Sequence, residues 1–162
     1  MSSETIRPAT PSDRLWLIGA MAGISDHERT LHDSRLPGAD CAGAYLAQVE
    51  AAIAAHGGGI RIATRGEARL GCVAFYVRHD DNAAETPDSN VFGLVSDLFV
   101  VETERGHGLA GRLLAEAERY FRSAGLRRMR IGALVANAPA IRAYRKSGFA
   151  DYELVLEKTL GP

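Results

Sequence analysis

Apolar and polar residues follow two periods along this chain, and the period changes repeatedly. Apolar residues spaced three or four apart predict helices over 11–22, 39–56 and 109–124, with a shorter helix that begins at Asn137 and ends before Gly148. Short apolar or alternating runs predict strands at 5–9, 60–64, 69–78, 91–101, 128–135 and 150–160. We therefore expect a mixed α/β (α+β) fold in which all 162 residues, 1–162, form one domain.

Local signals sharpen several of these boundaries. Thr10 has the pattern of a helix N-cap, with Pro11 at the first helical position and Asp13 as its capping-box partner. Residues 25–38 are expected to form a loop with at most a helical turn, and the polar stretch 79–90 is the one long loop. The run 91–101 is almost continuously apolar, which predicts a strand buried on both faces. A helix joins it to the strand at 128–135, so these two strands must be parallel if they are adjacent.

Composition narrows the function classes. The chain is 46% hydrophobic with a formal net charge of −1, which argues against bulk nucleic-acid binding. Cys41 and Cys72 have no metal or redox spacing, and we expect reduced thiols and no metal site. The first ten residues have no apolar core, and no apolar run is long enough to span a membrane. We expect a cytoplasmic protein without nucleic-acid or membrane partners.

A glycine-rich turn stands between the predicted strand at 91–101 and the helix that follows it. The stretch ETERGHGLAGRLL (102–114) places Gly106, Gly108 and Gly111 after Arg105. A turn into a helix exposes unpaired N–H groups, and glycine lets an anion approach the backbone closely, so the turn is a candidate pyrophosphate cradle. A Walker A loop is excluded because no lysine is present, and the dinucleotide fingerprint GHGLAG lacks its acidic ribose partner. A tight turn without a ligand stays open as the alternative.

Two motifs together carry a resemblance to a known family. RGHGLAGRLL resembles the acetyl-CoA signature R/Q-x-x-G-x-G/A of the GNAT superfamily of N-acetyltransferases, with Arg105, Gly108 and Ala110 at its defined positions. NAPAIRAYRKSGF resembles the second motif of that superfamily, at Asn137, Ala140, Tyr144, Gly148 and Phe149. The resemblance extends over nearly the whole chain, and the short segment DLFV is similar to the diamine acetyltransferases within the superfamily.

The resemblance implies a fold and a co-substrate. We expect a mixed, mostly antiparallel sheet with helices on both faces, whose fourth and fifth strands are parallel and splay apart to hold acetyl-CoA. Backbone groups of Phe99, Val100 and Val101 would pair with the pantetheine arm, and Asn137 would bind its amides or cap a helix. The pyrophosphate would lie on Arg105 and on the N–H groups of Gly106, His107, Gly108, Leu109, Ala110 and Gly111.

Acetyl transfer to an amine needs a proton acceptor, an acid for the departing thiolate and a donor for the oxyanion. Tyr144 is the candidate acid, although a core tyrosine is the alternative. Asp97 is the only acid inside the fourth strand and could hold a cationic substrate or take its proton through water; a structural carboxylate is the alternative. Many family members have a glutamate where this chain has Ser96, so acids of the loop at 80–88 are further candidates for the base. His79 and His107 could also act as bases, but we interpret both as solvated loop residues.

These observations lead to an acetyl-CoA-dependent N-acetyltransferase with Tyr144 and Asp97 as catalytic residues and a small-molecule or peptide amine as acceptor. A non-catalytic CoA-binding or sensor domain of the same fold is the alternative. The acidic loop and Asp97 favour cationic acceptors, and a homodimer is one arrangement that the family implies.

Overall fold

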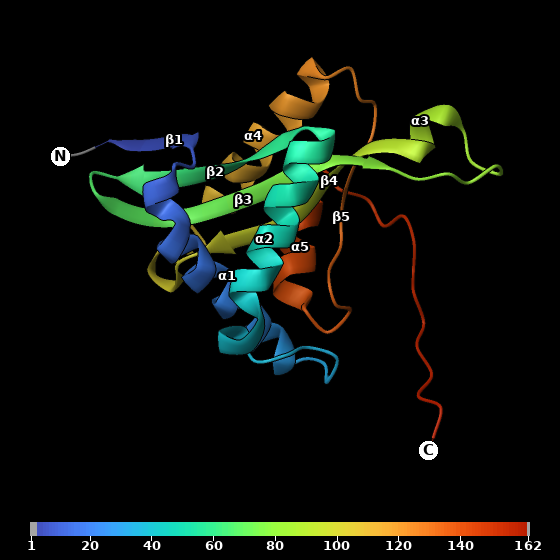
Figure 1. Cartoon of the computed structure of the whole chain (residues 1–162), viewed down its shortest axis with the longest axis horizontal. Coiled ribbons are helices and arrows are strands. Elements are labelled where there is room, and N and C mark those ends of the chain that lie inside the picture. Colours follow the sequence, from blue (N-terminus) through green and yellow to red (C-terminus); the bar gives the residue numbers. More distant parts are fainter. Residues whose placement is uncertain (1–2, 162) are drawn as a thin grey trace.

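A five-stranded sheet forms the centre of the molecule, which the computed structural model describes over residues 3–161 (Figure 1). The strands lie in the order of the sequence, and only the last pair is parallel. The strands are β1 (Glu4–Pro8), β2 (Gly58–Arg65), β3 (Ala68–His79), β4 (Val91–Val100) and β5 (Met129–Ile131). The expected mixed, mostly antiparallel sheet with a parallel fourth and fifth strand is confirmed.

Helices cover both faces of this sheet, as predicted. They are α1 (Arg14–Arg29), α2 (Gly38–His56), α3 (Pro87–Asn90), α4 (Leu109–Ser123) and α5 (Ala138–Lys146), with short 3₁₀ turns at Pro11–Asp13 and Glu102–Glu104. The period of two along β3 divides the core: Cys72 and Ala74 pack under α1 and α2, whereas Val73 and Phe75 pack under α4. The helices α1 and α2 therefore bury their apolar sides against one face of the sheet, and α4 buries its apolar side against the other.

The start of α1 follows the predicted capping box. Asp13 is fully buried and accepts hydrogen bonds from the backbone N–H and the hydroxyl of Thr10, at 2.8 and 2.9 Å. Its carboxylate also pairs with Arg7 and Arg69, each at 2.7 Å. The other end of α1 differs from the prediction: residues 25–29 continue the helix instead of opening into a loop. The longer α1 thereby extends beside β4.

The parallel pair β4 and β5 separates after a short contact. Gly93 to Val95 pair with Met129 to Ile131, and no further pairs are formed among the described residues. A β-bulge on β4 lies at this point, because Ala74 of β3 pairs with Asp97 and Phe75 pairs with Val95, leaving Ser96 as the extra residue. A bulge bends and twists its strand, which accounts for the splay. The predicted strand 128–135 is correspondingly shorter, and residues 132–136 leave the sheet.

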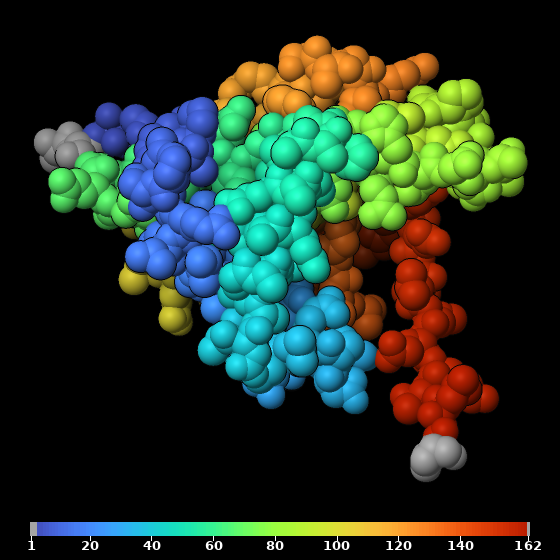
Figure 2. Space-filling model, viewed as in Figure 1, coloured from blue at the N-terminus to red at the C-terminus, as the bar shows by residue number. Residues whose placement is uncertain are grey.

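The predicted strand at 150–160 is wrong for the single chain. Residues 150–161 form no strand and are exposed, apart from partial contacts at their start. Figures 1 and 2 show this stretch, in red, running away from the sheet along the outside of the molecule. An alternating sequence becomes a strand only where another strand supplies hydrogen-bond partners, and within the described range 3–161 no strand pairs with it. Across residues 3–161, no helix combines the length and the apolar character needed to cross a membrane.

Candidate active site

A cleft of about 1350 Å³ opens where β4 and β5 separate. Its floor is β4 from Leu94 to Val100, and the end of β5 with α5 forms one wall. The last turn of α1 and the first turns of α2 form the opposite wall, and the glycine turn before α4 closes one end. The two sequence motifs, which begin 32 positions apart in the chain, therefore meet in one cavity.

The glycine turn has backbone conformations that require glycine. Gly106 and Gly108 have φ angles of 80° and 79°, and Gly108 is the N-cap of α4. The first helical hydrogen bond runs from the N–H of Arg112 to the carbonyl of Gly108, and within residues 3–161 the N–H groups of 106–111 have no recorded backbone acceptor outside α4 itself. Gly106, Gly108, Leu109, Ala110 and Gly111 all line the cleft, whereas His107 does not. Unpaired N–H groups and the positive end of α4 thus face the cavity, which suits an anion.

Arg105 stands at the junction between β4 and this turn. Its Nε donates to the carbonyl of Val100 at 3.0 Å, which holds the guanidinium over the end of β4. Arg105 also lines the cleft. Its positive charge adds to that of the helix N-terminus beside it.

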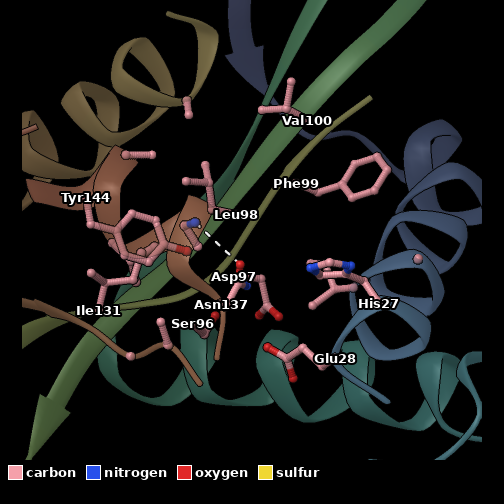
Figure 3. A pocket seen from close by; sticks show the side chains of 18 of the residues that line it. His27, Glu28, Ser96, Asp97, Leu98, Phe99, Val100, Ile131, Asn137 and Tyr144 are labelled. Atoms are coloured by element: carbon pink, nitrogen blue, oxygen red, sulfur yellow. Dashed lines mark hydrogen bonds between the residues drawn. The ribbon is translucent and has the colours of Figure 1, made fainter. Parts of the chain in front are cut away.

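The exposed edge of β4 supplies the backbone groups on the cleft floor. From Ser96 to Val100 the side of β4 that faces away from β3 has no strand partner among the described residues. Phe99 and Val100 line the cleft, and the Phe99 ring points toward α1, where it meets Trp16 edge-on at 6.0 Å between ring centroids (Figure 3). Val101 does not line the cleft. Its N–H donates to the carbonyl of Leu70 at 2.9 Å and is therefore not available to a ligand. Phe99 and Val100 are therefore the accessible members of the expected backbone set.

Asp97 lies directly after the bulge and projects into the cleft (Figure 3). Only 6% of the residue is exposed, and its Oδ2 accepts a hydrogen bond from the Tyr45 hydroxyl at 3.1 Å. Burial raises the pKa of Asp97 to about 6, against the opposing effect of hydrogen bonds from Ser96 and Tyr45. A carboxylate with this pKa is still ionised at neutral pH and is a stronger base than an exposed aspartate.

Tyr144 faces the cleft from the wall formed by α5. Asn137 caps this helix by accepting the N–H of Ala140 at 3.4 Å, and it also lines the cavity. The Tyr144 ring packs beside Phe149, at 6.2 Å between centroids, and no hydrogen bond to its hydroxyl is recorded from residues 3–161. Burial, with smaller contributions from Glu28 and Asp97, raises the pKa of Tyr144 to about 12. The phenol therefore stays protonated, and within residues 3–161 no hydrogen bond competes with a ligand for its hydroxyl.

Two residues that the sequence analysis missed or set aside complete the cleft. Glu28, on the last turn of α1, directs its carboxylate toward that of Asp97 (Figure 3). It accepts from Arg35 Nε at 2.5 Å, and its charge raises the pKa of Asp97. Tyr45, on α2, also lines the cleft, and its hydroxyl donates the hydrogen bond to Asp97. Glu28 lies in a polar stretch without periodicity, so only the fold brings it here.

The loop acids that served as candidate bases are elsewhere. No residue from 79 to 90 lines the cleft. Asp80 pairs with Arg78 at 3.0 Å and Asp88 with Arg128 at 3.1 Å, both at the far end of the sheet. Across residues 3–161, no group of three or more His, Cys, Asp or Glu side chains is arranged to hold a metal ion.

Comparison with known proteins agrees with this geometry. The chain resembles two solved structures of the aminoglycoside N-acetyltransferase AAC(6')-Iy. The first, in complex with CoA, has 20% identity and TM-score 0.72 over 99% of this chain and 96% of that one. A second, in complex with a bisubstrate analogue of CoA and acetylneamine, has 21% identity and TM-score 0.71 over 99% and 100%. A transcriptional regulator from Bacillus halodurans C-125 has 16% identity and TM-score 0.73 over 98% and 100%. At these identities the likeness shows the fold alone.

A search among curated proteins found no match to this sequence. The sequence model of the acetyltransferase (GNAT) family, however, matches residues 28–149. This range includes both motifs and all of the residues that line the cleft, apart from those of α1 up to His27. Family, fold and cleft agree, and the chain belongs to the GNAT family of acetyltransferases.

Proposed function

We propose that this protein transfers the acetyl group of acetyl-CoA to a primary amine by direct attack of the amine on the thioester. One observation carries the proposal. The splayed cleft joins an N–H-lined glycine turn, a buried carboxylate at Asp97 and a protonated phenol at Tyr144 in a single cavity. The glycine turn and Arg105 suit the pyrophosphate, and the open edge of β4 suits the amides of the pantetheine arm.

The proton balance assigns a role to each side chain. A lysine-like amine with a pKa of about 10.4 is neutral in roughly one molecule in 2,500 at pH 7. Asp97 takes the proton of the attacking nitrogen, through water, as the C–N bond forms. The C–S bond then breaks, and Tyr144 donates its hydroxyl proton or a hydrogen bond to the departing sulfur. Between these two steps, a free N–H on the edge of β4 donates a hydrogen bond to the oxyanion of the tetrahedral intermediate.

The acceptor end of the cleft favours cations. The Asp97 and Glu28 carboxylates face each other across it, and within residues 3–161 the ion pair formed by these two carboxylates is that of Glu28 with Arg35. An amine with a second positive charge can place one nitrogen at Asp97 and the other near Glu28. The acids of the 80–88 loop do not contribute to this preference, because that loop does not line the cleft.

The test is thiol release from acetyl-CoA over a panel of acceptors: a diamine, a polyamine, an amino sugar, a lysine-containing peptide and glutamate. We expect amine-dependent release and a product that is one acetyl group heavier by mass spectrometry, with cationic amines ahead of glutamate. A protein that binds CoA but releases no thiol with any amine would be the sensor domain instead. Preference for glutamate would refute the cationic acceptor while leaving acetyl transfer intact.

A further inference from the structure

Four charged side chains connect the glycine turn to the first two strands of the sheet. Glu4 on β1 and Arg65 on β2 are direct partners in the strand register. Glu104 ends the 3₁₀ turn that precedes the glycine turn, and Arg112 lies in the first turn of α4, which follows it. We call Glu4, Arg65, Glu104 and Arg112 the charged clamp, because they link both ends of the glycine turn to the same place on the sheet.

Two bidentate ion pairs hold the charged clamp together. Arg65 donates to both carboxylate oxygens of Glu104, from Nη1 at 2.8 Å and from Nη2 at 2.9 Å. Arg112 donates in the same way to Glu4, from Nε at 2.9 Å and from Nη2 at 3.1 Å. Arg65 Nη2 also lies 3.8 Å from Glu4 Oε2, which joins the two pairs. Bidentate pairing fixes the orientation of both partners, which a single-contact surface pair does not do.

The charged clamp also reaches the backbone of the glycine turn. Arg112 Nη1 donates to the carbonyl of His107 at 3.1 Å, so the guanidinium that pairs with the sheet also holds the turn. Gly106 and Gly108 lie between Glu104 and Arg112, with φ angles of 80° and 79°. Glycine loses more conformational freedom than other residues when it is ordered. Restraints at both ends of the turn therefore reduce the entropy that a ligand must remove.

We propose that the charged clamp positions the glycine turn for the pyrophosphate of CoA, with Glu4 as the central positioning residue. Glu4 contacts both arginines, so its removal frees Arg112 from the sheet and separates the two ion pairs. A turn that is ordered in advance binds its ligand more tightly, because less freedom is lost on binding. This inference rests on the proposed binding of acetyl-CoA, but it uses neither Asp97 nor Tyr144.

The direction of the effect separates positioning from simple electrostatics. The pyrophosphate is an anion, and a carboxylate near it repels it through space. If the charge of Glu4 acts only at a distance, Glu4→Gln strengthens the binding of CoA. If Glu4 positions the turn, the same substitution weakens it. Pantetheine lacks the pyrophosphate, so neither effect changes its affinity.

The test is calorimetric titration of CoA and of pantetheine into the wild-type protein and its variants. We expect Glu4→Gln to bind CoA about fivefold more weakly, at the upper end for an exposed pair because Glu4 joins two pairs, and pantetheine with wild-type affinity. In thiol release with the best amine of the panel, KM for acetyl-CoA should rise while kcat at saturation stays unchanged. Glu118→Gln is the matched control. It also removes a carboxylate paired with an arginine, Arg122 at 2.7 Å, but farther along α4, and it should change neither affinity.

A double variant tests whether Glu4 and Arg112 act together. Glu4→Gln combined with Arg112→Gln should weaken CoA binding less than the product of the two single effects, because each substitution removes the same pair. Independent effects, unchanged or tighter CoA binding in Glu4→Gln, or an equal loss for CoA and pantetheine would overturn the positioning role and leave the proposed function standing. A wild-type protein that binds CoA no better than pantetheine would overturn the pyrophosphate site itself, and this inference with it.

Discussion

Replacing Tyr144 with phenylalanine isolates the proposed acid. The ring, which packs beside Phe149, is retained, and only the hydroxyl is removed. The hydroxyl has no recorded hydrogen bond within residues 3–161, so the free energy of unfolding should change by less than about 0.5 kcal/mol. A core tyrosine with a bonded hydroxyl would instead lose about 1 kcal/mol. Stability and turnover therefore separate the two roles of this residue.

The size of the effect on turnover follows from the raised pKa of Tyr144. A buried phenol with a pKa of about 12 and a thiol with its ordinary pKa of about 8.5 differ by roughly 3.5 units, so full proton transfer from this phenol to such a thiolate is uphill by about 4.8 kcal/mol. A thiol that is buried in the same place beside Asp97 and Glu28 also has a raised pKa, and this reduces the pKa difference between the phenol and the thiol. We expect kcat to fall about 10²–10³-fold, in the lower part of the range for general acid catalysis, with CoA affinity nearly unchanged.

The assay is single-turnover thiol release with a saturating amine, supported by urea unfolding. Tyr120→Phe is the matched control, because Tyr120 packs against Phe75 at 5.3 Å on the α4 side of the sheet and does not line the cleft. The wild-type pH profile should show no alkaline limb from Tyr144 below about pH 11, since its pKa is raised to about 12. A kcat within about threefold of wild type, with chemistry rate-limiting, would remove Tyr144 from the mechanism.

Three further predictions concern carboxylates. Asp97→Asn should lower kcat about 10²–10⁴-fold and abolish the acid limb of kcat/KM near pH 6. Because the folded pKa of Asp97 is raised, the wild-type protein should lose stability as pH rises from about 4 to 6, and the variant should not show this loss. An unchanged pH profile would exclude Asp97 as the base. Glu28→Gln should raise KM about fivefold for a diamine and little for a monoamine, and equal changes for both would refute its role in holding a second charge. Asp13→Asn should destabilise the fold by about 3 kcal/mol at pH 7 in urea unfolding. Because the pairing with Arg7 and the other donors holds the Asp13 pKa well below its usual range, this contribution should be fully present above about pH 4 and decrease progressively as pH falls below that value. A variant as stable as wild type at pH 7 would contradict the buried ion-pair account.

The sequence predicted most of the scaffold because the signals there are local. The capping box at Thr10 and Asp13 and the glycine turn before α4 depend on residues a few positions apart. The hairpin of β2 and β3 likewise follows from two apolar runs around the turn at 66 and 67. Both family motifs are short, and each corresponds to one turn or one helix in the structure.

The rest of the site depends on contacts between distant segments. Glu28 reaches the cleft only because α1 extends through Arg29, and nothing in the polar sequence around it marks that extension. Tyr45 has the spacing of a core residue of α2, and its hydrogen bond to Asp97 spans 52 positions of the sequence. The strand expected at 150–160 failed for the converse reason: its pattern is that of a strand, but no strand within residues 3–161 pairs with it.

The central claim is that the cleft between β4 and β5 holds CoA with its pyrophosphate on the glycine turn. Calorimetric titration of CoA and of pantetheine, which lacks the pyrophosphate, tests it most directly. We expect CoA to bind at least about 100-fold more tightly, a difference of about 2.7 kcal/mol. Gly108→Val should abolish that difference, whereas Gly125→Val, at a φ of 76° beyond the other end of α4, imposes similar backbone strain away from the cleft and should preserve it. Equal affinities of the wild-type protein for CoA and pantetheine would contradict the account.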